Sequence, residues 1–418
     1  MATGRLLVRG GDVIDTEPEP VLRPATDVLV EDGRIAAVGP DLPADGAEII
    51  DATDRLVLPG LVDTHRHVWQ AALRAVAVDD DLGAYLQRVL FGLGPRMRPQ
   101  DVRVSNLAGA LECLDSGVTT VQDFSHIQHG PEHTDAGVDA LRESGIRAVF
   151  GYGYPIQEEA GRRPDEVRRV RERFDGGLLT MALAPVGPAY APIEVVEQDW
   201  RLAEELALPI VVHIGSGPAA ERPIEALRQR GLLRADTLYV HGNSLPDGEL
   251  RLIADSGAAV SITPAVEAQM GHGPPMINRL RAAGITTGLG VDVVTTVAGD
   301  MFSVMRAALL TSQLGEGERW RAAGMLRLAT LDGARALGLG DRIGSLRPGK
   351  QADIVLVRAD APNLLAAHDP IGAVVTAAHP GNVDTVLVAG RVVKRDGRLL
   401  HAVPADELRR SAEHVVRA

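Results

Sequence analysis

Short apolar runs alternate with helix-like segments through the middle of the chain. The runs predict β-strands and the segments between them predict helices, which is typical of βα units around a parallel sheet. Eight such runs span close to the ~250 residues of a (β/α)8 barrel, and a doubly wound open sheet is the rival arrangement. The eight predicted strands cover residues 56–62, 118–123, 146–151, 179–185, 209–215, 237–242, 258–263 and 285–291.

Both ends of the chain carry a different pattern, in which short β-rich runs alternate with turns. Asp32-Gly33 lies between two of these runs near the N-terminus and is a strong hairpin signal. The same texture returns in three runs near the C-terminus. We therefore expect an α/β protein with a (β/α)8 TIM barrel over residues 59–343. A small β-sandwich domain should be built from both chain termini, residues 1–58 and 344–418.

Composition and charge narrow the class of protein. The 418 residues are 45% hydrophobic and 24% charged, as in an ordinary globular enzyme, and the formal net charge is −13. This negative balance argues against nucleic acid or an anionic membrane surface as a partner. The single cysteine, Cys113, fits a reducing cytoplasm, and no apolar run approaches the ~18–20 residues of a membrane span. We expect a cytoplasmic enzyme with a small-molecule substrate.

Four histidines and one aspartate lie at the C-terminal ends of predicted strands, where barrel enzymes have their active sites. His65 and His67 are two residues apart on a strand, so their side chains point to the same side. His213, His241 and Asp292 each end a further strand. Imidazole and carboxylate groups suit Zn²⁺ or Fe²⁺, and a bound cation lowers the pKa of a water molecule to about 7. The second carboxylate oxygen of Asp292 can accept that water's proton.

These residues lie in longer blocks of sequence that are similar to a known family. Residues 58–67 read Leu-Pro-Gly-Leu-Val-Asp-Thr-His-Arg-His, residues 117–120 read Gly-Val-Thr-Thr, and residues 289–292 read Leu-Gly-Val-Asp. The chain resembles the amidohydrolase superfamily over nearly its full length. The branch it resembles holds cytosine and guanine deaminases, S-adenosylhomocysteine deaminases and chlorotriazine hydrolases.

The resemblance implies a metal-dependent hydrolase that attacks a carbon–nitrogen bond, other than a peptide bond, in a cyclic or ring-borne amine or amide. It implies that Asp292 is the general base and also a metal ligand. His241 would contact the metal or orient the water and substrate. A homodimer or a higher homo-oligomer is implied as well. The remaining metal ligands carried over from the family are His65, His67 and His213.

The lysines bear on the number of metal ions. The family's binuclear members bridge two metals with a modified lysine on strand four. Here the only lysines are Lys350 and Lys394, both near the C-terminus. The resemblance therefore implies one divalent metal ion, with zinc expected ahead of iron.

One position departs from the pattern of the branch. Its deaminases carry a glutamate three residues after the strand-five histidine as a proton shuttle, and this chain has Ser216 there. A hydroxyl cannot replace a carboxylate in protonating a leaving amine. Asp292 can act as sole base and acid, or Glu267 can supply the carboxylate. A non-hydrolytic metal-dependent lyase, isomerase or decarboxylase stays open as the alternative, as does a family member that only binds its ligand.

Several side chains near the predicted strand ends are candidates for substrate contact. His126 lies in the loop after strand two, and His272 lies in the loop after strand seven. Aromatic side chains also gather near these ends, and aromatic walls suit a flat, ring-containing substrate. The expected substrate-binding residues are Trp69, His126, Tyr154, Ser216 and His272.

Overall fold

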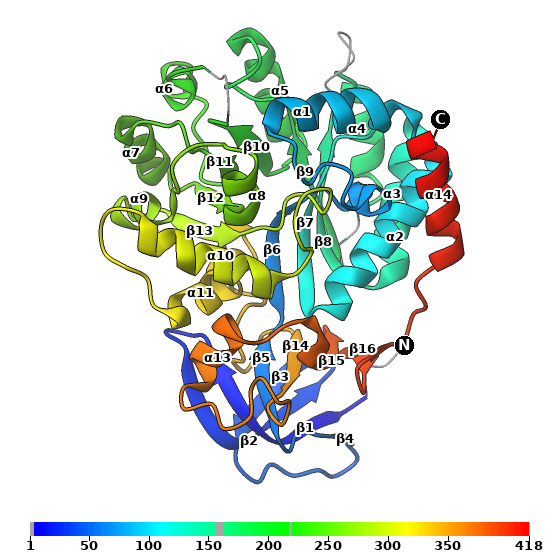
Figure 1. Ribbon diagram of the computed structural model, residues 1–418, viewed down its shortest axis with the longest axis vertical. Coiled ribbons are helices and arrows are strands. Elements are labelled where there is room, and N and C mark those ends of the chain that lie inside the picture. The colour runs from blue at the N-terminus through cyan, green and yellow to red at the C-terminus, as the bar shows by residue number, and fades with distance from the viewer. Residues whose placement is uncertain (1–3, 156–161, 175, 217–219, 418) are drawn as a thin grey trace.

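The computed structural model describes residues 4–155, 162–174, 176–216 and 220–417. Figure 1 shows two parts, a barrel of strands ringed by helices and a smaller β-rich part beneath it. The expected fold class is confirmed, because eight parallel strands form the barrel and strands from both chain termini form the second part. The domain boundaries at 58/59 and 343/344 stay predictions.

The barrel strands are hydrogen-bonded to one another in chain order. A parallel sheet covered by helices is buried on both faces, which explains why each strand is a nearly continuous apolar run. The first and last strands meet at a bridge between Arg66 and Asp292. The strands are β6 Leu61–Arg66, β7 Val118–Ser125, β8 Arg147–Gly153, β9 Leu179–Ala184, β10 Ile210–Ile214, β11 Thr237–His241, β12 Ala259–Ile262 and β13 Thr286–Leu289.

Helices surround the barrel, and several begin with proline, whose fixed φ suits the first helical position. Helix α10 begins after Asp300, whose carboxylate accepts a hydrogen bond from the Ser303 amide at 2.9 Å. The helices are α2 Pro99–Asp115, α3 Pro131–Ser144, α4 Pro164–Arg171, α5 Ile193–Glu205, α6 Pro223–Gln229, α7 Asp247–Ser256, α8 Pro264–Gln269, α9 Ile277–Ala282, α10 Met301–Leu314, α11 Ala322–Leu328 and α12 Leu331–Ala336.

Nine strands from the two ends of the chain form one continuous mixed sheet. Its order is β17-β16-β15-β14-β5-β1-β2-β3, with β4 paired to β1. The N-terminal strands are β1 Leu6–Asp15, β2 Val21–Glu31, β3 Arg34–Gly39, β4 Glu48–Asp51 and β5 Arg55–Pro59. The C-terminal strands are β14 Ile354–Arg358, β15 Val383–Val388, β16 Arg391–Arg395 and β17 Arg398–Leu399.

The run 56–62, predicted as one strand, is two strands in different sheets. Strand β5 ends at Pro59 in the terminal sheet, and β6 begins at Leu61 in the barrel. Gly60 lies at the corner between them. Glycine is required at this position, because a Cβ there would lie only 2.0 Å from Thr119 Oγ1. The prediction of a single strand was wrong, since the apolar run continues through the corner.

A buried ion pair joins the barrel to the terminal sheet. Arg147, at the start of β8, donates to both carboxylate oxygens of Asp353 at 2.9 and 3.0 Å. The Asp353 carboxylate also accepts from the Ala389 amide, and its backbone carbonyl accepts from the Gly60 amide. The amino ends of the barrel strands therefore face the terminal sheet, and their carboxyl ends point away from it (Figure 1).

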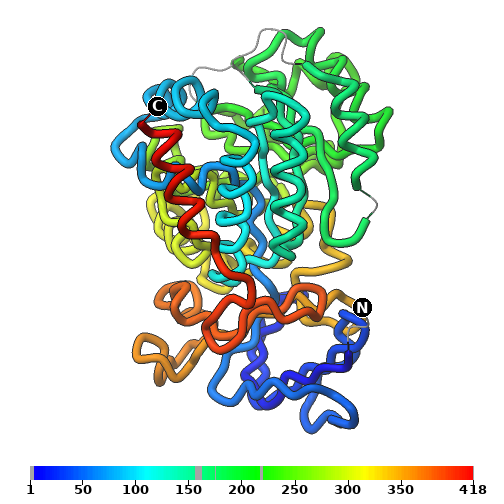
Figure 2. Tube along the Cα trace, turned by 90° about the vertical axis from the view of Figure 1, so that its right-hand side faces the viewer, coloured from blue at the N-terminus to red at the C-terminus, as the bar shows by residue number. Residues whose placement is uncertain are grey.

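Shorter elements complete the chain. The segment after β6 contains the 3-10 helix η1 Val68–Leu73, then α1 Leu82–Tyr85, the π-helix η2 Leu86–Leu93 and the 3-10 helix η3 Gly94–Arg96. Near the C-terminus lie α13 Pro370–Thr376 and η4 Pro380–Asn382. The last helix, α14 Ala405–Arg417, leaves the terminal sheet and lies along the barrel against α2 (Figure 2). Among the described residues, none of the helices has the length and apolarity needed to cross a membrane.

Candidate active site

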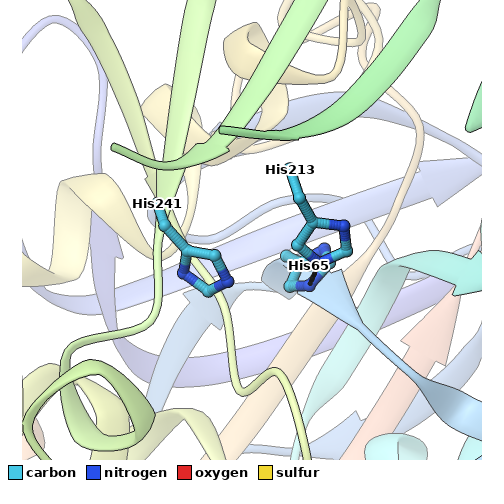
Figure 3. Close-up of side chains that lie close together, drawn as sticks. All are labelled: His65, His213 and His241. Atoms are coloured by element: carbon cyan, nitrogen blue, oxygen red, sulfur yellow. Dashed lines mark hydrogen bonds between the residues drawn. The ribbon is translucent and has the colours of Figure 1, made fainter. Parts of the chain in front are cut away.

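The predicted ligands converge at the carboxyl end of the barrel. His65 Nε2 lies 3.2 Å from His213 Nε2 and 3.3 Å from Asp292 Oδ1. His67 Nε2 lies 3.4 Å from the same carboxylate oxygen. Figure 3 shows the rings of His65 and His213 in contact, with His241 beside them. The structure thus brings together side chains that are up to 227 positions apart in sequence.

The protonation states of these side chains favour binding of a cation. Burial, helped by the His65 ring, lowers the pKa of His67 to about 3, so its imidazole is neutral. His67 Nδ1 lies 2.8 Å from the Phe124 carbonyl oxygen and must donate to it, which leaves a lone pair on Nε2. That lone pair faces a carboxylate oxygen of Asp292, so two hydrogen-bond acceptors oppose each other. A divalent metal ion between them would satisfy both.

The pKa shifts of the other candidate ligands also favour a bound cation. Burial lowers the pKa of both His65 and His213. Burial opposes ionisation of Asp292, but the hydrogen bond and charge of His65 and the other imidazoles hold its carboxyl pKa well below the usual range. Neutral imidazole and ionised carboxylate are the forms that bind metals. The donor atoms of two overlapping groups lie within 4.8 Å of one another, namely His65, His213 and His241, and His65, His67 and Asp292.

His241 differs from the other three histidines. Burial favours its neutral ring, but the carboxylates of Glu267 and Asp292 raise its pKa. His241 Nδ1 donates to Glu267 Oε1 at 3.2 Å, and its Nε2 lies 3.6 Å from Asp292 Oδ2. Both His241 and Asp292 have φ of +68°, a left-handed conformation that is strained for residues other than glycine. The fold therefore holds this pair in one orientation.

Glu267 lies behind His241 and does not line the main cavity. Its carboxylate accepts hydrogen bonds from the Thr263 amide at 2.8 Å and from Asn243 Nδ2 at 3.3 Å. These bonds direct Oε1 at the His241 ring. Glu267 was expected as a possible proton donor to the leaving group, and that role stays a prediction. In the structure its carboxylate contacts the His241 ring from outside the cavity lining.

Ser216 and His272 both line the cavity, as expected. The Ser216 hydroxyl lies 3.4 Å from His272 Nδ1, and the His272 ring stands edge-on to His241 with centroids 4.7 Å apart. Burial lowers the pKa of His272 to about 4. Tyr190 holds the backbone of Ser216, since its hydroxyl donates to the Ser216 carbonyl at 2.7 Å and accepts from the amide at 3.1 Å.

His126 lines the cavity, but Trp69 does not. The His126 ring stacks on His67 with centroids 4.4 Å apart. Trp69 is fully buried, and its Nε1 donates to His126 Nδ1 at 3.2 Å. Because burial keeps His126 neutral by lowering its pKa, the ring carries its proton on Nε2. Trp69 was expected to contact the substrate; here it sets the tautomer of a residue that can.

The cavity has a volume of about 340 Å³ and opens beside the donor cluster. Tyr154 lines it, as expected. Sequence reasoning missed most of its apolar wall, although Leu82, Leu86 and Leu90 recur every four residues, a spacing that predicts one face of a helix. The lining residues outside the predicted set are Leu82, Tyr85, Leu86, Leu90, Phe124, Ala184, Pro185, Val186, Tyr190, Met270 and Val293.

Comparison with protein families and curated relatives gives matches over most of the chain. The model of the Amidohydrolase family matches residues 56–393. The 5-methylthioadenosine/S-adenosylhomocysteine deaminase of Symbiobacterium thermophilum is 32% identical over 417 residues, covering 94% of each chain. The 5'-deoxyadenosine deaminase of Methanothermobacter thermautotrophicus is 30% identical over 391 residues, 89% of this chain and 90% of the relative.

Two solved structures with zinc are similar over nearly the whole chain. An adenosine deaminase from Xanthomonas campestris with bound zinc has a TM-score of 0.88 and 28% identity, covering 99% of this chain and 98% of that chain. Atrazine chlorohydrolase from Arthrobacter aurescens, complexed with zinc, has a TM-score of 0.86 and 25% identity, covering 98% and 100%.

Proposed function

The chain belongs to the amidohydrolase family, and we propose that within this family it removes an exocyclic amino group from a flat heterocyclic ring such as a 6-aminopurine. Membership makes it a hydrolase of carbon–nitrogen bonds in ring amines. The observation that carries the proposal is the convergence of four histidines and one carboxylate beside a cavity with aromatic walls. The full-length relatives that are deaminases of adenine nucleosides support this choice of ring.

We assign one divalent metal ion to His65, His67, His213 and Asp292, with zinc ahead of iron. When bound, the ion would polarise a water molecule and lower its pKa toward 7. The opposed acceptors on His67 and Asp292 support the site. The lysines support a single ion, since Lys350 and Lys394 both lie outside the barrel strands.

The remaining catalytic roles fall to side chains of the protein. Asp292 Oδ2 accepts a hydrogen bond from Thr263 Oγ1 at 3.3 Å and is available to take the proton of the attacking water. His241, held by Glu267, orients that water against the ring carbon. Water adds to the carbon and the bond to the amino group breaks. Asp292 then returns the proton to the departing nitrogen, which leaves as ammonia.

The test is ammonia release from a panel of aminopurines, aminopyrimidines and aminotriazines in oxygen-labelled water. We expect one labelled oxygen in the product for each ammonia released. Asp292→Asn should lower kcat by about 10²–10⁴-fold, the usual contribution of general acid–base catalysis. Absence of turnover across the panel would overturn the proposal. A product without labelled oxygen would point instead to the lyase, isomerase or decarboxylase alternative raised by Ser216.

We further propose that the protein is a homodimer or a higher homo-oligomer in the cytoplasm. The single cysteine, Cys113, is fully buried and supports a reducing compartment. Light scattering after size-exclusion chromatography tests the assembly, and a monomer at micromolar concentration would contradict it.

A further inference from the structure

One wall of the cavity is built by a single stretch of chain. Helix α1 runs directly into the π-helix η2, and together they cover residues 82–93. Leu82, Leu86 and Leu90 are each four residues apart, about one helical turn, so they lie on the same face. All three line the cavity. π-Helices are rare and occur frequently at functional sites.

The apolar character of the cavity extends beyond these leucines. Val186, Met270 and Val293 also line it. Two of the polar groups in the lining already have protein partners. The Tyr85 hydroxyl accepts a hydrogen bond from Gln70 Nε2 at 2.7 Å, and the Tyr190 hydroxyl bonds the backbone of Ser216. Apart from the donor cluster and the side chains of His126, Tyr154, Ser216 and His272, little of the lining can therefore bind a polar substituent.

The charges in the cavity are equally restricted. No arginine or lysine lines the cavity among the described residues, and Asp292 is the one acidic side chain in that lining. The undescribed residues contain no arginine or lysine by sequence. A carboxylate or phosphate on the substrate would therefore be taken out of water without a cationic side chain to pair with it. An unpaired buried charge carries a large free-energy penalty.

We propose that the leucine wall, Leu82, Leu86 and Leu90, selects a ring that carries an uncharged, apolar tail such as an alkyl or thioalkyl group. The same ring is rejected when its tail ends in a carboxylate, a phosphate or a zwitterionic amino acid. This inference rests on the proposed function, because the wall faces the cavity in which the ring amine would react. It adds to the proposed class of ring a requirement on the substituent that the ring carries.

The first test compares substrates that differ only in the tail. The pairs are 5'-methylthioadenosine against S-adenosylhomocysteine, and an ethylamino-triazine against the matching carboxymethylamino-triazine. We expect kcat/KM to favour the apolar member of the reactive pair by at least about 100-fold, in line with the penalty for an unpaired buried charge. If the charged member is used as well as the apolar one, the inference is overturned while the proposed function stands.

The second test places a cation on the wall. Leu86 is only partly buried, so an arginine there can reach water and the fold should tolerate it. Leu86→Arg should reduce the preference for the apolar tail at least about 10-fold, by gaining activity on the carboxylate as it loses activity on the alkyl group. Phe91→Arg is the matched control. Phe91 lies on the same π-helix, is 42% exposed and does not line the cavity.

The outcomes separate the two proposals. Equal preferences in the Leu86→Arg and Phe91→Arg proteins, both with wild-type melting temperatures, would overturn the leucine wall as the selective element. Absence of turnover for all four compounds and for the rest of the panel of ring amines would instead overturn the proposed function. Isothermal titration of the same compounds still tests the wall in that case, because the apolar member of a pair should bind at least about 10-fold more tightly. Equal binding of both members would overturn it.

Discussion

Replacing Gly290 with alanine should weaken metal binding, because the new methyl group would strike the backbone that carries the ligands. Gly290 follows the last residue of β13. A Cβ at this position would lie 2.7 Å from the carbonyl oxygen of His65 and 2.9 Å from its amide nitrogen. The same carbonyl oxygen accepts a hydrogen bond from the Asp292 amide at 2.8 Å. The substitution therefore perturbs two proposed ligands, His65 and Asp292, at their shared contact.

The magnitude follows from the size of the clash. Ordinary van der Waals contact begins near 3.4 Å, so the two strands must separate by about 0.7 Å. Backbone cannot yield as the end of a flexible side chain can. We expect the free energy of unfolding to fall by about 1–3 kcal/mol, the usual cost of overpacking. Metal affinity should fall about 10–100-fold, as it does when groups that orient metal ligands are lost.

Competition with a zinc chelator measures the affinity, and thermal unfolding of the metal-free protein measures the stability. Gly248→Ala is the matched control, because Gly248 lies in α7 with no atom within 4 Å of a Cβ placed on it. That variant should keep its zinc affinity and become slightly more stable, since alanine favours a helix more than glycine does. Wild-type zinc affinity and stability in the Gly290→Ala protein would refute the reasoning.

Three further perturbations test other parts of the site. Removing the metal with a chelator should abolish deamination, and added zinc should restore it at one ion per chain; two ions per chain by elemental analysis would contradict the single site. Glu267→Gln should lower kcat about 10–100-fold with unchanged metal content, because the amide no longer favours a proton on His241. Steady-state kinetics and metal analysis measure both quantities, and an unchanged kcat would contradict the positioning role of Glu267. Burial raises the pKa of Asp123 from its ordinary value of 3.8 to about 7, so between these pH values the folded protein keeps a proton that the unfolded chain releases. Stability from this group is present below the ordinary value and is lost as the pH rises to 7, by up to about 4 kcal/mol. Asp123→Asn should flatten urea-unfolding free energies between pH 4 and 7, and an unchanged slope would count against the shift.

The strands of the barrel could be predicted from sequence because each is buried on both faces and so reads as an apolar run. The same property explains the one error in the strand assignment. The run from Leu56 to Val62 is apolar throughout, and hydrophobicity does not report that the chain leaves one sheet and enters another. Pro59-Gly60 was the only local signal, and the need for glycine arises from Thr119, which is distant in sequence.

The positions near the strand ends could be predicted, but the direction in which each side chain points could not. Trp69 follows β6 closely, yet its ring turns behind His126 and away from the cavity. Glu267 is a carboxylate near the donor cluster, yet Thr263 and Asn243 direct it to the far side of His241. Which face a side chain presents depends on packing between elements, and sequence spacing along one element does not contain that information.

The two oxygens of Asp292 explain how the site can work with Ser216 in place of a second carboxylate. Oδ1 faces the His65 and His67 nitrogens at 3.3 and 3.4 Å, so it belongs with the proposed metal ligands. Oδ2 instead faces Thr263 Oγ1 and the His241 ring, which are groups that can hold or exchange a proton. One carboxylate can thus bind the metal through one oxygen and carry the proton on the other. Ser216 then removes a proton donor without removing the route by which the proton reaches the leaving nitrogen.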